Sequence, residues 1–177
     1  NLNGVLLGTN GLLVVKVSPT NGFIVPPETR VLSDARFIDT AISPLNNSSL
    51  SVLLVQSATA PMEATDYDAD NDGVFDIAPL DSATIVDAIG IRKLATDPVY
   101  GGARIPNVGD NKTPEALVRL LGDTRARNAD AWFAGRMNGS GLTKVFGPEV
   151  TANFPPGATL PPGEENIVFT ALSIVQS

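Results

Sequence analysis

A run of acidic residues carries the clearest chemistry in this sequence. Seven of the 19 acidic residues lie between positions 63 and 81, a window without lysine or arginine, and the other 12 balance the 12 basic residues. This window therefore holds the whole net charge of −7. Carboxylates this close repel one another unless a cation neutralises them, so the window predicts a metal-binding loop. Its closely spaced acids are Asp66, Asp68, Asp70, Asp72 and Asp76.

Calcium is the ion that this loop fits best. Ca²⁺ takes about six to eight oxygen ligands in a flexible arrangement, and acids at alternate positions can supply them by folding around the ion. The acids from Asp68 onward match positions 1, 3 and 5 of a D-x-D-x-D-G pattern, and Gly73 supplies the sharp turn. We predict a Ca²⁺ site with these ligands: Asp66, Asp68, Asp70, Asp72, Asp76 and the carbonyl oxygen of Val74.

The loop differs from an EF-hand at its end. Pro79 stands where that motif has a bidentate glutamate, and the flanking residues are not helical. A closing ligand is therefore expected from Asp66, Asp81 or Asp87. Magnesium is a poorer match, because the sequence implies neither a phosphate partner nor a strict octahedral cage. Three apolar residues interrupt the acids and are expected to anchor the loop against a core: Val74, Phe75 and Ile77.

The residue types that are missing restrict the chemistry further. The chain has no histidine and no cysteine, which removes the commonest general base, the triad imidazole, thiolate nucleophiles and the usual zinc ligands. A hydrolase that uses aspartates alone is an alternative, but a loop that wraps its ion with five carboxylates leaves little open coordination for a substrate. We therefore expect that the protein is not an enzyme.

The composition predicts one mostly β domain. The chain has 177 residues, of which 43% are hydrophobic and 18% charged, with 16 glycines and 14 prolines, as is typical of many short strands joined by turns. We expect a single domain over residues 1–177. No apolar run approaches the ~20 residues that span a bilayer. The basic residues are scattered, most densely at Arg92-Lys93 and Arg125-x-Arg127, so we expect no nucleic-acid binding.

Apolar segments predict the strands. The Asn10-Gly11 pair predicts a hairpin between residues 4–7 and 12–17. Residues 51–56 contain the continuous apolar run Val52-Leu53-Leu54-Val55, which indicates a strand buried on both faces. Asp87 lies in the middle of a predicted strand and needs a backbone N–H, an arginine or the metal as its partner. The other predicted strands are residues 35–42, 84–91, 142–146 and 166–175.

Two segments contain helix signals. Residues 113–121 begin with a Thr-Pro cap but are equally consistent with a strand. Residues 128–134 predict a short helical turn that presents Trp132 and Phe133 to the core. Residues 97–110 and 153–163 predict loops, because they are rich in glycine and proline.

Several short segments together resemble secreted bacterial domains related to the lamin-tail fold. They include the acidic run with its flanking strands, Asp97-x-x-Tyr100, residues 113–119, Ala131-Trp132-Phe133-x-Gly135 and Leu160-x-Pro162-Gly163. The resemblance implies an immunoglobulin-like β-sandwich with long loops and at most one or two short helices. It also implies an exported, calcium-binding domain for surface attachment or assembly. Because related domains accompany extracellular nucleases or phosphatases as non-catalytic modules, no catalytic residue carries over.

These observations lead to one main functional expectation and one alternative. We expect a secreted, calcium-stabilised structural or adhesive protein of the bacterial cell surface. Its apolar terminal strands need a neighbour and can pair with adjacent subunits to form a homo-oligomer or a fibre, and its surface partner would be a glycan or a protein. The alternative is a non-catalytic binding module of a secreted nuclease, phosphatase or other hydrolase. The start at Asn1, without an initiating Met, predicts a processed product or a trimmed fragment, and removal of a signal peptide is the expected cause.

Overall fold

The predicted mostly β fold is confirmed by a computed structural model. The model describes residues 4–16, 24–33, 49–92, 94, 96–105, 116–135, 137–138, 145–146 and 162–164. In this part of the chain the secondary structure consists of short strands and one 3-10 helix, η2 (Ala129–Ala131). No helix in these residues is long and apolar enough to cross a membrane.

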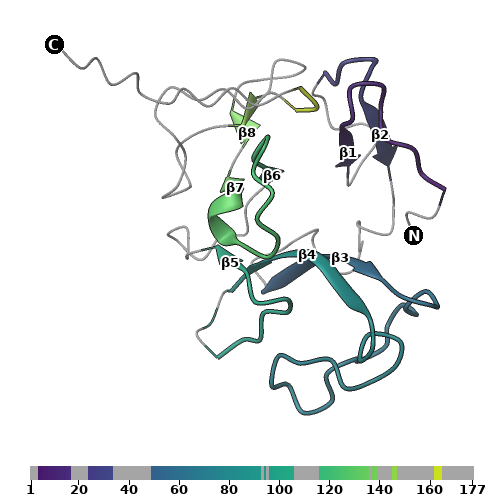
Figure 1. The fold of residues 1–177 in the computed structure, drawn as a ribbon. Coiled ribbons are helices and arrows are strands. Elements are labelled where there is room, and N and C mark those ends of the chain that lie inside the picture. Colours follow the sequence, from purple (N-terminus) through teal and green to yellow (C-terminus); the bar gives the residue numbers. More distant parts are fainter. Residues whose placement is uncertain are drawn as a thin grey trace, which may run out of the picture.

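The largest sheet has three strands and carries the acidic loop. Its order is β3 (Leu50–Gln56), β4 (Thr84–Ile91) and β5 (Arg104–Ile105). The first two strands are antiparallel, whereas β4 and β5 are parallel. The strands predicted at 51–56 and 84–91 are therefore confirmed, and the acidic loop is the connection between them (Figure 1). The loop predicted at 97–110 contains β5 within its described part.

The prediction that residues 51–56 are buried on both faces is wrong. Val52 and Leu54 remain 41% and 47% exposed, and burial alternates along β3. The reason is the pairing: among the described residues, β3 lies at the edge of the sheet and pairs only with the antiparallel strand β4. Antiparallel sheets commonly have one covered and one open face.

The predicted N-terminal hairpin is also wrong. β1 (Leu13–Lys16) pairs in parallel with β2 (Arg30–Ser33), while residues 5–7 form no strand. The predicted turn does form, but the Asn10 amide donates to the buried hydroxyl of Thr29, 2.7 Å away, just before β2. This contact places β2 beside β1, in the position that the predicted hairpin assigned to residues 4–7.

Residues 113–121, for which the sequence allowed a helix or a strand, form a strand at 116–119. β6 (Ala116–Arg119) pairs antiparallel with β7 (Trp132–Gly135). The helical turn predicted at 128–134 is confirmed only for η2, because residues 132–134 belong to strand β7. A further antiparallel pair joins β8 (Met137–Asn138) to β9 (Val145–Phe146), at the end of the strand predicted for 142–146. The strands predicted at 35–42 and 166–175, and the loop at 153–161, lie outside the described residues.

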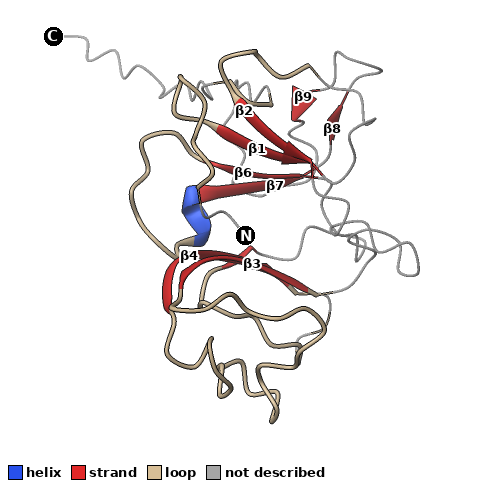
Figure 2. Cartoon of the chain, turned by 90° about the vertical axis from the view of Figure 1, so that its right-hand side faces the viewer, coloured by secondary structure: helices blue, strands red, loops and turns tan. Residues whose placement is uncertain are grey.

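The buried core joins the three-stranded sheet to the β6–β7 pair. Its buried residues are Ile89, Ala103 and Ile105, and Trp132 packs against them. Phe133, only 1% exposed, is the largest fully buried side chain of the described residues. Both aromatic residues therefore take the packing role predicted for them. In two views, β1, β2, β6 and β7 lie on one side of the molecule, and β3 and β4 lie on the other (Figure 1, Figure 2).

Asp87 finds the partners that its position in β4 required. Its carboxylate lies 3.1 Å from Nε of Arg119 and accepts the backbone N–H of Arg127 at 2.7 Å. The same Arg119 guanidinium lies over the ring of Trp132, 5.5 Å from its centroid. Asp87 therefore ties β4 to the β6–β7 pair and is not directed to the acidic loop as a closing ligand.

Gly101 provides a test of how closely the 96–105 segment packs on β4. It has a positive φ of 80°, and a Cβ there would overlap the side chain of Ala88. We expect Gly101→Ala to lower the free energy of unfolding by about 2–5 kcal/mol, since the left-handed conformation costs ~1–2 kcal/mol and the overlap ~1–3 kcal/mol more. Thermal denaturation followed by circular dichroism measures the loss.

Gly102 is the matched control for this substitution. Its φ is 84°, and no other atom of the described structure lies within 4 Å of an added Cβ. Gly102→Ala should therefore show the conformational cost alone, about 1–2 kcal/mol. Equal losses in the two variants would contradict the close packing of Gly101 on Ala88.

Candidate metal site

Local hydrogen bonds fold the acidic loop and explain its two-residue spacing. Asp66 accepts the backbone N–H of Asp68 at 3.1 Å, Asp70 that of Asp72 at 3.3 Å, and Asp72 that of Val74 at 2.8 Å. A carboxylate that accepts the N–H two residues later makes an Asx turn. The alternating acids therefore bend their own backbone, and this part of the loop shape is encoded locally.

Asp68 is the buried centre of the loop. Its side chain is 1% exposed, and the Oδ1 atom accepts the N–H of Asp72 at 3.0 Å. The Oδ2 atom accepts the N–H of Gly73 and the hydroxyl of Tyr100, both at 2.9 Å. Gly73 has a φ of 92°, as expected for the sharp turn. A carboxylate offers about four lone-pair positions, and these three bonds occupy two of them on Oδ2 and one on Oδ1.

The pKa values show how Asp68 stays charged. Burial by itself raises the pKa of Asp68, but the hydrogen bonds from Gly73, Tyr100 and Asp72 outweigh it and leave that pKa below its ordinary value. These bonds stabilise the ionised form. Asp68 is therefore held as a carboxylate, ready to act as a ligand.

Asp70 shows the opposite shift. The N–H of Asp72 lowers the pKa of Asp70, but repulsion from the Asp72 carboxylate, desolvation and the nearby Asp68 carboxylate together raise it. A raised carboxyl pKa means that the surroundings resist another negative charge. The loop therefore lacks a positive charge at this point.

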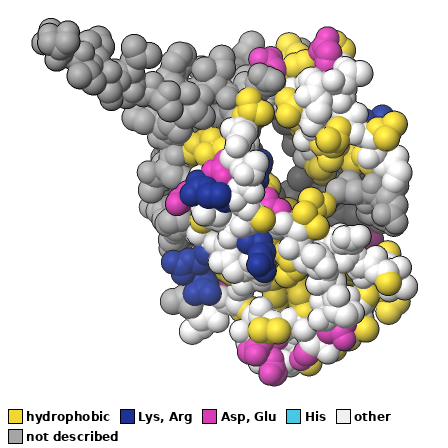
Figure 3. All heavy atoms as spheres, viewed as in Figure 1, with side chains coloured by type: hydrophobic (Ala, Val, Ile, Leu, Met, Phe, Trp, Pro, Cys, Tyr) yellow, Lys and Arg dark blue, Asp and Glu magenta, His cyan; other side chains and the backbone are white. Residues whose placement is uncertain are grey.

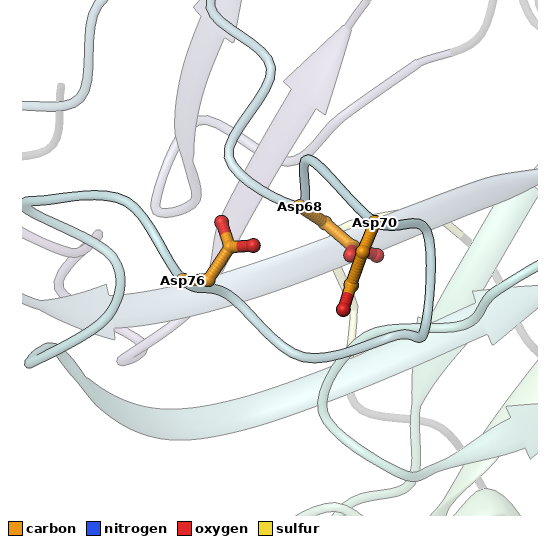
Figure 4. Close-up of side chains that lie close together, drawn as sticks. All are labelled: Asp68, Asp70 and Asp76. Atoms are coloured by element: carbon orange, nitrogen blue, oxygen red, sulfur yellow. The ribbon is translucent and has the colours of Figure 1, made fainter.

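Three carboxylates converge on one point. Asp68, Asp70 and Asp76 each place an oxygen within 4.8 Å of the other two. Figure 4 shows Asp68 and Asp70 close together on one limb of the loop and Asp76 on the returning limb. The limbs are joined by the N–H of Asp76, which donates to the carbonyl of Tyr67 at 3.0 Å. Of the six predicted ligands the structure brings these three together, while Asp66, Asp72 and the Val74 carbonyl remain predictions.

The three carboxylates lie close enough together to share one metal ion. Calcium–oxygen distances of about 2.3–2.6 Å allow two ligands of one ion to lie up to roughly 5 Å apart. Magnesium requires about 2.0–2.1 Å and a stricter octahedron than calcium. The described residues thus bring together three carboxylates that could hold a metal ion. Figure 3 shows this acidic end of the molecule as a group of Asp and Glu side chains.

The sequence motifs did not assign Tyr100 to the site. It lies 32 positions from Asp68 in the chain, and its ring stacks on Phe75 with centroids 4.6 Å apart. Burial first, and then the hydrogen bond to Asp68, raises the pKa of Tyr100 to about 12. Phe75 is half-buried as predicted, whereas the other two expected anchors, Val74 and Ile77, are exposed.

No protein-family model, curated protein or solved structure matches the chain. The likeness to lamin-tail-related domains therefore rests on the sequence motifs.

Proposed function

We propose that this protein is an exported, calcium-stabilised β-sandwich with a structural or adhesive role at the bacterial cell surface. The observation that supports it most directly is the convergence of the Asp68, Asp70 and Asp76 carboxylates in the loop between β3 and β4. In this proposal the ion is Ca²⁺, and the strands form an immunoglobulin-like arrangement. The proposal rests on the site chemistry and on the family resemblance.

The proposed role of the ion is to stabilise the fold. The loop has a carboxylate held in its charged form beside a second one that resists ionisation, and a divalent cation would relieve this repulsion. The chain has no cysteine for disulfides. Extracellular calcium modules bind with dissociation constants of about 10⁻⁴–10⁻³ M, matched to the calcium outside cells, so a modest site would suffice.

A structural role also follows from how the carboxylates are used. All three carboxylates of the cluster accept backbone N–H groups of the same loop. The chain has no histidine or cysteine to act as a base or a nucleophile. We therefore propose a non-enzymatic protein.

Assembly through strand edges is the second part of the proposal. In the part of the chain that the structure describes, β3 is an edge strand, and it presents the exposed aliphatic side chains of Val52 and Leu54. An exposed apolar edge can accept an added strand. Residues 166–175 include seven apolar residues and no charge, which makes them suitable for addition to another copy.

Size-exclusion chromatography and electron microscopy, with calcium and with a chelator, test the assembly. We expect oligomers or fibres in calcium that shrink or dissociate when the ion is removed. A strictly monomeric protein at every calcium concentration would contradict assembly but not calcium binding. The calcium titrations described below test the metal site independently.

The alternative of a binding module has one observation in its favour. Val52, Leu54 and Val86 are exposed on the paired strands β3 and β4, and such a surface could receive a neighbouring domain. A hydrolase domain beside this one in the full reading frame would favour the alternative. The absence of such a domain would favour the surface protein.

A further inference from the structure

Tyr100 contacts the proposed site from outside the acidic loop. Its hydroxyl donates to Oδ2 of the buried Asp68 at 2.9 Å, and its ring stacks on Phe75 at an interplanar angle of 10°. Its backbone N–H donates to the hydroxyl of Ser51 in β3 at 3.1 Å. One residue therefore contacts a candidate ligand, an apolar side chain of the loop and the sheet below it.

We infer that Tyr100 is a positioning residue for the cation, an inference that rests on the proposed function. By donating to Oδ2, the hydroxyl helps to fix the rotation of the Asp68 carboxylate, whose Oδ1 accepts the N–H of Asp72 and would face the ion with its other lone pair. Groups that hydrogen-bond to ligating carboxylates orient them, and losing one typically weakens metal affinity about 10–100-fold. The Tyr100 hydroxyl has the position of such a group.

The same contacts connect the ion to the sheet. Ser51, which accepts the N–H of Tyr100, belongs to β3. Gly101, the residue after Tyr100, packs on Ala88 of β4. Tyr100 can hold Asp68 only while its own segment is docked on these strands. Cation affinity therefore depends on a segment that supplies none of the clustered carboxylates.

Calorimetric titration of the chelator-treated full chain with CaCl₂ tests this role. Tyr100→Phe removes one hydroxyl and keeps the ring that stacks on Phe75, so we expect the dissociation constant to rise about tenfold or more. Tyr67→Phe is the matched control, because it removes the only other tyrosine hydroxyl of the chain. That hydroxyl bonds with the backbone of Met62, and its loss should change the affinity less than twofold.

The outcomes separate the inference from the function on which it rests. A native chain that binds no calcium would overturn the proposed metal site. A native chain that binds calcium, with equal affinities for Tyr100→Phe and Tyr67→Phe, would overturn only the positioning role. A lower melting temperature of Tyr100→Phe in chelator, without a change in affinity, would show a purely structural role and also overturn it.

Terbium luminescence provides a second measurement that does not require Tyr100→Phe to fold. Tb³⁺ substitutes for Ca²⁺ and emits when a nearby excited tyrosine transfers energy to it. In Tyr67→Phe, Tyr100 is the only tyrosine, and we expect a tyrosine-shaped excitation spectrum for the terbium emission. Terbium that binds without tyrosine sensitisation would place the ion away from Tyr100 and overturn the inference.

Discussion

Calcium at 100 times its dissociation constant is expected to raise the melting temperature of the native chain by roughly 5–11 °C. Asp70→Asn should remove that rise. A ligand that binds only the folded form stabilises it in proportion to the logarithm of its free concentration, and Asp70 supplies one of the three converging carboxylates. Differential scanning calorimetry in CaCl₂ and in chelator measures both effects.

The melting temperature of Asp70→Asn in the absence of calcium is the stricter test of this prediction. The pKa of Asp70 is raised by the neighbouring carboxylates, so its charge destabilises the ion-free loop. Asp70→Asn should therefore melt in chelator at the same temperature as the native chain, or slightly above it. Loss of stability that is equal in calcium and in chelator would show that the loop is held by something other than an ion.

Asp81→Asn is the matched control for charge. It removes one negative charge from the same acidic window, but Asp81 is not part of the three-carboxylate cluster. This variant should keep most of the calcium-induced rise. If it loses the rise as fully as Asp70→Asn does, the effect of calcium is general screening of the acidic surface.

Phe133→Ala is expected to lower the free energy of unfolding by about 3–5 kcal/mol, which is a large part of the roughly 5–15 kcal/mol that holds a typical domain together. Phe133 is 1% exposed and follows Trp132 in β7, the residue that packs against the core cluster. Truncation loses the transfer free energy of the ring and leaves a cavity. Urea denaturation followed by circular dichroism measures the change in free energy.

The same measurement on an exposed residue calibrates this result. Leu121 follows the β6 strand and is 53% exposed, so Leu121→Ala should change the free energy of unfolding by no more than about 0.5 kcal/mol. A similar small effect for Phe133→Ala would contradict the core position of Phe133. The calcium response should persist in any folded Phe133→Ala protein, because the substitution keeps all three clustered carboxylates.

Local information in the chain was enough for several features. The two-residue spacing of the acids predicted a folded loop, and the structure shows that Asp66, Asp70 and Asp72 make their own turns with N–H groups two residues away. The strand at 84–91 and the need of Asp87 for an arginine or N–H partner were likewise predictable. Hydrophobic pattern, turn chemistry and the cost of an unpaired buried charge all act over a few residues.

Long-range packing determined the rest. The structure has parallel β1–β2 pairing in place of the hairpin expected at the N-terminus. The hydrogen bond between Asn10 and Thr29 favours this pairing, and a local sequence pattern cannot predict it because the two residues lie 19 positions apart. The 116–119 segment became a strand because β7 pairs with it. In the same way, which three acids converge depends on how the loop closes, and Tyr100 joins Asp68 only because its segment folds back onto β3 and β4. Spacing along the chain reveals which groups can bind a cation, whereas distances between remote residues decide which of them meet.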